Sequence, residues 1–131
     1  MAGGLTISTL NNDTGVFATQ NAITGIAKAW INFNGVTNAI RSSYNISSIT
    51  DNGTGDYTLN FTTAMPNENY TVVSAPSTYN DNTGVCVGIK MNGGNDAPLL
   101  YTTTQVRIQV VAANANSSRD LPFVGVAILS S

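Results

Sequence analysis

The sequence predicts an all-β fold, an antiparallel, jelly-roll-like β-sandwich of about eight strands that follows a short N-terminal arm. Two observations favour this fold. Gly, Asn, Thr and Ser, which are weak helix formers, recur every few residues along the chain. Short segments of alternating apolar and polar residues are separated by clusters of turn residues, a rhythm typical of sandwiches and barrels. The length of 131 residues suits a single domain with one core.

The composition narrows the class of protein. Only 9% of the residues are charged, whereas typical globular proteins have roughly a quarter. A highly charged disordered chain is therefore excluded, and the polar surface must consist of Asn, Thr, Ser and Gly. Such a surface is more typical of fibrous, extracellular or virion proteins than of a cytosolic enzyme. The net charge is -2 and no basic stripe is present, so nucleic acid is not expected as a partner.

The first 25 residues differ from the rest. Leu5, Ile7 and Leu10 form a short alternating segment, residues 11–15 form a turn cluster, and residues 15–25 are mildly apolar. Two interpretations stay open: residues 1–25 are an arm or short stalk for attachment or trimerisation before a knob domain of residues 26–131, or they begin that same domain. Neither a signal peptide nor a membrane-spanning run is recognisable, so we expect synthesis in a cytoplasm and no membrane insertion.

The β pattern becomes clear from residue 26 onwards. In the first strand, Ala29, Ile31 and Phe33 share one parity, and Lys28 and Trp30 share the other, so opposite faces of a strand are predicted for the two sets. The strands expected in order are 26–33, 40–46, 47–50, 57–61, 70–75, 85–91, 104–112 and 122–129.

One hairpin is especially well defined. Residues 51–56 contain two glycines, which supply the positive φ that tight hairpin loops need. The following arm alternates, with Tyr57, Leu59 and Phe61 on one face.

Two further predictions concern which side chains are buried. Ile40, Tyr44 and Ile46 are expected to share one face of a single strand. Residues 85–91 show little alternation and are expected to be buried on both faces. Cys86, the single cysteine, is then a small buried hydrophobic residue.

The chain offers little for catalysis. It has no histidine and one cysteine, so neither a Ser-His-Asp or Cys-His arrangement nor the usual transition-metal sites are predicted. Paired carboxylates remain, but every acidic residue falls in a predicted turn or loop, where aspartates usually bond their own backbone. The loop at 51–56 lacks the ligand spacing of helix-loop-helix calcium sites. We therefore predict no catalytic residue, no cofactor and no metal.

Aromatic residues give the candidate contacts. Trp30 has the opposite parity to Ile31 and Phe33, so it is expected to face a partner subunit or a sugar ring. A loop aromatic beside amides also suits carbohydrate, because the ring stacks on the sugar face and the amides bond its hydroxyl groups. An ordinary polar loop is the alternative. The predicted receptor or partner contacts are Trp30, Tyr79, Asn80, Asp81 and Asn82.

Three sequence blocks carry a resemblance to a known family. They are residues 25–35 (GIAKAWINFNG), residues 40–57 (IRSSYNISSITDNGTGDY) and residues 60–66 (NFTTAMP), with Tyr70 shortly after. Together they resemble a β domain at the ends of tail-fibre-like proteins of phages, including cyanophages and other marine phages. The resemblance covers residues 5–75 and implies a virion fibre or knob, commonly trimeric, without a catalytic motif.

The resulting hypothesis is a phage tail fibre or fibre tip that attaches to a host receptor. Its expected partners are two further copies in a homotrimer, other virion proteins of the fibre shaft, tail or capsid, and a host-surface glycan. The expected location is the virion, after synthesis in the cytoplasm of an infected bacterium. The alternatives are a capsid decoration or head-fibre protein, in which the N-terminal arm grips the shell, and, further from the pattern, a glycan-degrading enzyme or a carbohydrate-binding module.

Overall fold

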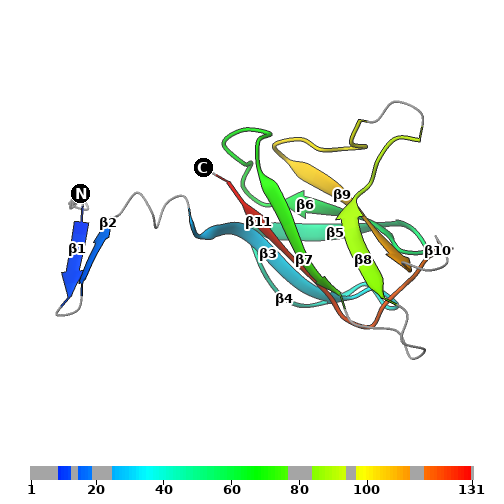
Figure 1. Cartoon of the computed structure of the whole chain (residues 1–131). Coiled ribbons are helices and arrows are strands. Elements are labelled where there is room, and N and C mark those ends of the chain that lie inside the picture. The colour runs from blue at the N-terminus through cyan, green and yellow to red at the C-terminus, as the bar shows by residue number, and fades with distance from the viewer. Residues whose placement is uncertain are drawn as a thin grey trace.

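The chain folds into a sandwich of two antiparallel sheets, which confirms the predicted all-β class (Figure 1). This computed structural model describes residues 9–12, 15–18, 25–76, 84–93, 97–112 and 117–130. Every secondary-structure element named below for these residues is a β-strand.

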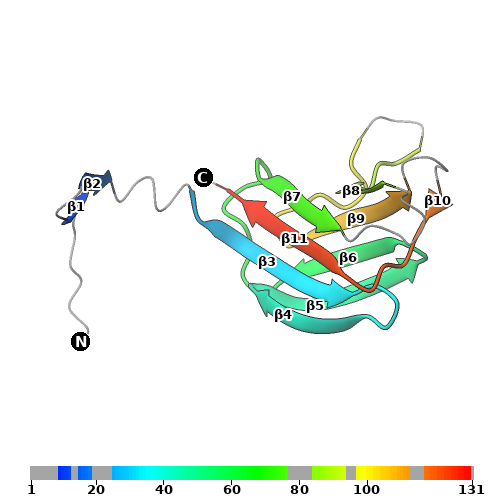
Figure 2. The same ribbon diagram turned by 60° about the horizontal axis from the view of Figure 1, so that its bottom comes forward.

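The two sheets form two layers, which Figure 2 shows with the four-stranded sheet in front. The four-stranded sheet has the order β4 (Ala39–Tyr44), β3 (Ala27–Asn34), β11 (Val124–Leu129) and β7 (Thr71–Pro76). The five-stranded sheet contains β5 (Ile46–Gly53), β6 (Asp56–Phe61), β9 (Gln105–Ala112) and the short β10 (Ser117–Ser118), with β8 (Val85–Ile89) on the other side of β9.

The N-terminal part forms a separate hairpin. Strands β1 (Thr9–Asn12) and β2 (Gly15–Ala18) pair with each other in a two-stranded sheet and lie apart from the sandwich in both views (Figures 1 and 2). Asn11 and Asn12, predicted to belong to a turn, are strand residues that pair with β2. The hairpin register allows this because only two residues separate Asn12 from its partner Gly15. Leu5 and Ile7 lie outside the described residues.

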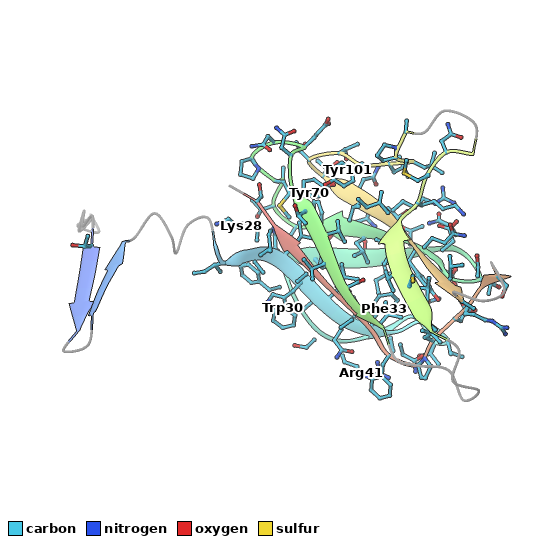
Figure 3. All side chains as sticks on the ribbon, viewed as in Figure 1. Lys28, Trp30, Phe33, Arg41, Tyr70 and Tyr101 are labelled. Carbon is cyan, nitrogen blue, oxygen red and sulfur yellow. The ribbon has the colours of Figure 1, made fainter. Side chains whose placement is uncertain are left out.

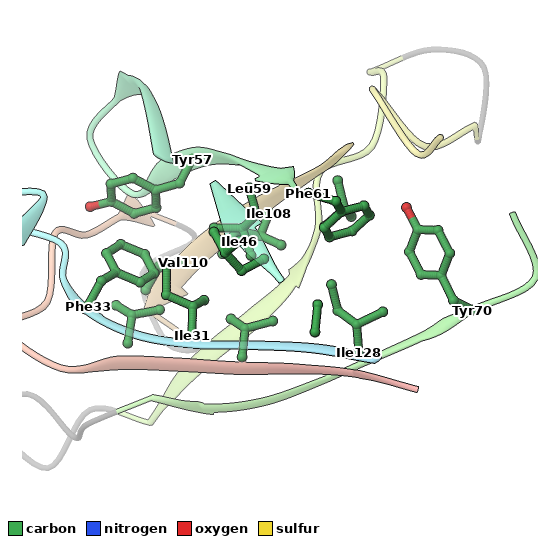
Figure 4. Packing of buried hydrophobic residues seen from close by; sticks show 14 of the residues in the cluster. Ile31, Phe33, Ile46, Tyr57, Leu59, Phe61, Tyr70, Ile108, Val110 and Ile128 are labelled. Carbon is green, nitrogen blue, oxygen red and sulfur yellow. The ribbon is translucent and has the colours of Figure 1, made fainter. Parts of the chain in front are cut away.

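The core lies between the sheets and follows the predicted alternation (Figure 4). Ala29, Ile31 and Phe33 of β3 are buried, and so are alternate residues of β6, β9 and β11. The rings of Phe33 and Tyr57 meet edge to face with their centroids 5.1 Å apart, which joins the two layers. Burial of each large apolar side chain stabilises the fold by roughly 1.5–3 kcal/mol.

The β5–β6 hairpin forms as predicted, and its glycines have the conformation that the turn requires. Gly53 and Gly55 have φ angles of 127° and 63°. At Gly55 a side chain would also have no room, because a Cβ there would lie 2.6 Å from the backbone of Val110 and Arg119.

Tyr57 ties three loops together at one end of the sandwich. Its hydroxyl lies 2.6 Å from Asp120 Oδ1 and 2.8 Å from the carbonyl oxygen of Gly35, and the amide of Gly55 also donates to Asp120 Oδ1. Burial, and then the neighbouring carboxylate of Asp120, raise the pKa of the Tyr57 phenol, so the hydroxyl keeps its proton and remains a donor. The network joins the β3–β4 turn, the β5–β6 turn and the segment before β11.

The prediction of one strand over residues 40–46 is wrong. The chain turns at Asn45, whose φ of 56° ends β4 and sends Ile46 into the other sheet. Ile46 is buried, whereas Ile40 and Tyr44 are exposed. Asparagine tolerates this backbone conformation better than most residues, which explains how the strand breaks without a glycine or proline.

The prediction that residues 85–91 are buried on both faces is also wrong. β8 pairs with β9 alone among the described strands, so it is an edge strand. Cys86 and Gly88 are exposed, and Val85 and Val87 pack against the core. Cys86 is therefore an exposed thiol and not a buried hydrophobic residue. A second difference is β10, which forms inside a segment predicted as a polar loop.

We predict that Tyr57→Phe lowers the free energy of unfolding by about 1–3 kcal/mol, because it removes the phenol donor from the carbonyl of Gly35 and from the Asp120 carboxylate, which keeps the Gly55 amide. Urea unfolding at a fixed chain concentration measures this change. Tyr44→Phe is the matched control, since that hydroxyl belongs to an exposed ring. Equal stability of the two variants would refute the structural role of the network.

Candidate functional site

The outer face of the four-stranded sheet has a continuous apolar row. Tyr44 of β4 pairs with Trp30 of β3, Trp30 pairs with Ala127 of β11, and Ala127 pairs with Val73 of β7. Directly paired residues of antiparallel strands point to the same face. The four residues, which we call the apolar row, therefore cross the whole sheet.

The members of the apolar row reach solvent. The exposed fractions are 58% for Tyr44, 38% for Trp30 and 49% for Val73. Ala127 and Gly125 of β11 have a short side chain and none, respectively, so they leave a depression between the larger side chains of Trp30 and Val73. The result is an open hollow of about 270 Å³, whose lining includes Trp30, Val73, Gly125 and Ala127.

The rest of this face is weakly polar. The neighbouring row consists of Ser42, Asn32, Gly125 and Ala75. Arg41, labelled in Figure 3, lies towards the far end of the sheet. Its guanidinium lies 4.2 Å from the centroid of the exposed Phe123 ring and donates to the carbonyl of Pro122. The positive charge of Arg41 therefore interacts with the Phe123 ring and the Pro122 carbonyl of the same chain.

A second hollow lies at the edge of the apolar row, where the chain passes from one sheet to the other. We call it the corner pocket. It has a volume of about 460 Å³ and is open to solvent. Its lining residues are Lys28, Tyr44, Asn45, Thr62, Thr63, Ala64, Met65 and Pro66.

Asn45 fixes the geometry of the corner pocket. Its Nδ2 donates to the carbonyl oxygens of Lys28 and Thr63 at 3.1 and 3.0 Å, and its Oδ1 accepts from the amide of Thr63 at 2.7 Å. The amide of Thr62 donates to the backbone carbonyl of Asn45. One side chain thus joins β3, the β4–β5 corner and the segment after β6.

The outer face of the five-stranded sheet is polar instead. Asn60 donates to the hydroxyls of Ser48 and Thr50, and Asn52 donates to that of Thr58. These bonds run between β5 and β6, so the side chains satisfy one another across the strands. The two outer faces of the sandwich therefore differ in kind, and the four-stranded sheet carries the apolar surface.

A charged cluster lies on this polar face. Arg107 of β9 donates to both carboxylate oxygens of Asp56, at 2.7 and 3.0 Å, and the ammonium of Lys90 lies 3.6 Å from the same carboxylate. Burial raises the pKa of Asp56, but the hydrogen bonds and charges of Arg107 and Lys90 outweigh it, so the pKa lies below its ordinary value of 3.8. Asp56, predicted to be a turn residue, is the first residue of β6.

Of the five predicted contact residues, only Trp30 lies within the described part of the chain. Trp30 is on the outer face, as its parity predicted, while Tyr79, Asn80, Asp81 and Asn82 lie outside the described residues. Tyr44, which the sequence assigned to packing, is the most exposed member of the apolar row. The signal that would have identified it is Asn45, the residue at which the strand ends.

Acidic side chains are missing from the linings of both hollows. Within the described ranges, no group of three or more His, Cys, Asp or Glu residues is arranged to hold a metal ion. In the same part of the chain, no helix has the length and apolar character needed to cross a membrane.

Comparison of the chain with known protein families, with characterised proteins and with solved structures finds no match.

We predict that the cluster around Asp56 makes stability depend on acid pH. The folded pKa of Asp56 is below 3.8, so its stabilisation is fully present above the unfolded value and is lost as the pH falls through the folded value. Asp56→Asn should lower the free energy of unfolding at neutral pH and flatten its decline below about pH 4. Urea unfolding at a series of pH values tests this. Lys90→Met keeps the Arg107 pair and should retain most of the decline; an unchanged decline in Asp56→Asn would contradict the assignment.

Proposed function

We propose that the chain is a non-catalytic structural protein of a phage particle, a short tail fibre or fibre tip that takes part in attachment to the host. The observation that carries the proposal is the apolar row on the outer face of the four-stranded sheet. Exposed apolar surface of this kind, in a chain with few charges, marks a surface that another molecule covers.

Identical copies suit this surface well. The apolar row and its neighbouring row contain no charged residue, so like-charge repulsion between two copies that meet across these rows is small. Lys28, which shares the parity of Trp30, lies beyond these rows in the lining of the corner pocket. The one nearby guanidinium, that of Arg41, is held by Pro122 and Phe123. We therefore propose that the centre of the outer face, around Trp30, Ala127 and Val73, packs against neighbouring copies in a homotrimer, the state that the sequence resemblance implies. Tyr44, on the edge strand β4, stays accessible in this arrangement.

The resemblance to phage tail-fibre-like proteins supports the location in a virion. Its three blocks coincide with β3, with β4 to the start of β6, and with the end of β6 and the segment after it. The three blocks contain Trp30 and Tyr44 of the apolar row and every lining residue of the corner pocket.

Binding without cleavage is the form of activity that the site supports. Glycoside hydrolysis usually needs two carboxyl groups on either side of the scissile bond. Neither hollow is lined by an acidic residue, and Asp56 is held by two cations on the opposite face of the sandwich.

We expect an antibody against the chain to label a few sites grouped at the tail of purified particles in electron micrographs. The free chain should also slow adsorption of the particles to host cells by occupying the receptor. Labels spread over the capsid lattice would favour the decoration or head-fibre alternative. Unlabelled particles would contradict a role in the virion.

We predict that the purified chain sediments as a trimer and that Trp30→Ser combined with Val73→Ser shifts it towards monomer. Each change removes apolar surface from the proposed contact. Met91→Ser is the matched control, because Met91 is 46% exposed and lies outside the apolar row. Sedimentation velocity over a range of chain concentrations measures the shift. A wild-type monomer, or equal trimer stability in all three proteins, would overturn the proposed contact.

A further inference from the structure

We propose that the corner pocket binds a pyranose ring of a host-surface glycan. This inference rests on the proposed role in attachment and names the class of ligand and the place where it binds. The pocket is separate from the hollow at the centre of the apolar row, since the two share no lining residue.

The size of the corner pocket fits a small ligand. Its volume of about 460 Å³ falls within the range of roughly 300–1,000 Å³ that is usual for small-molecule sites. Because it is open to solvent, it suits a ring that continues into a longer chain on either side.

The lining has the two surfaces that a sugar ring needs. Tyr44 supplies an exposed aromatic face, and Ala64 and Pro66, which are also exposed, supply apolar contacts. The C–H face of a pyranose stacks on such surfaces. Thr62 and Thr63 are exposed and carry hydroxyls that both donate and accept, which suits the hydroxyl groups around the ring edge.

The walls of the corner pocket are held in place before any ligand binds. Asn45 bonds to Lys28 and Thr63 through its side chain, and the amide of Met65 donates to the carbonyl of Thr103. Met65 itself is buried in the core. A preorganised site loses little conformational entropy on binding, which matters for a weakly held ligand such as a sugar.

The test is titration of the isotope-labelled full chain with methyl pyranosides of glucose, galactose, mannose and N-acetylglucosamine, followed by amide chemical shifts. At least one sugar should cause saturable shifts centred on Tyr44, Asn45 and residues 62–66. Tyr44→Ala should weaken binding about tenfold, and Tyr44→Phe, which keeps the ring, should change it by less than about twofold. No saturable shift with any of the four sugars would overturn the proposal.

A second variant avoids the apolar row. Thr63→Val keeps the backbone bonds to Asn45 and removes one hydroxyl, so binding should weaken about threefold to tenfold. Thr37→Val, an exposed threonine in the β3–β4 turn, is the matched control and should bind like the wild type. Equal binding by both threonine variants and by Tyr44→Ala would overturn the site.

The two proposals fail in different ways. If the chain labels the tail and slows adsorption, but Tyr44→Ala and Thr63→Val slow it equally well, the corner pocket is not the receptor site and the proposed function stands. If a sugar binds in the corner pocket but antibodies leave particles unlabelled, the site stands and its role in the virion does not.

Discussion

The pairing register of β3 with β11 is the constraint on which both the core and the candidate surface depend. Val126 pairs with Ile31 and Ala127 with Trp30, so the inward and outward sets of the two central strands coincide. A shift of one residue in β3 would move Trp30 into the core and Ile31 into solvent, and the same shift in β11 would exchange Val126 and Ala127. The burial of Phe33 against Tyr57 opposes such a shift, because the ring pair joins the two sheets. The same register therefore both stabilises the sandwich and exposes the apolar row.

Most of the sandwich was predictable because its strands alternate strictly. In β3, β6 and β9, apolar residues at every second position mark the buried face, and the glycines at 53 and 55 mark the hairpin between β5 and β6. The exceptions have local causes. The strand break at Asn45 needs no glycine, and the exposure of Cys86 follows from the edge position of β8, a property of the sheet order that a single segment does not record.

The candidate site was predictable in part. Trp30 was identified from its parity alone, since the residues on both sides of it are buried. Tyr44 was missed because it was placed on one strand with Ile46, which belongs to the other sheet. The corner pocket joins residues from β3, the β4–β5 corner and the segment after β6. Such a combination depends on how the two sheets stack, and strand periodicity carries no information about stacking.

The position of Trp30 has an experimental consequence. It is the only tryptophan of the chain, and it lies on the outer face at the boundary of the central hollow. The tyrosines of the chain absorb little light at the red edge of the tryptophan absorption band. Intrinsic fluorescence excited at the red edge of the absorption band therefore reads the environment of this single face without any attached dye, and contact with any molecule there changes the emission of the unmodified protein.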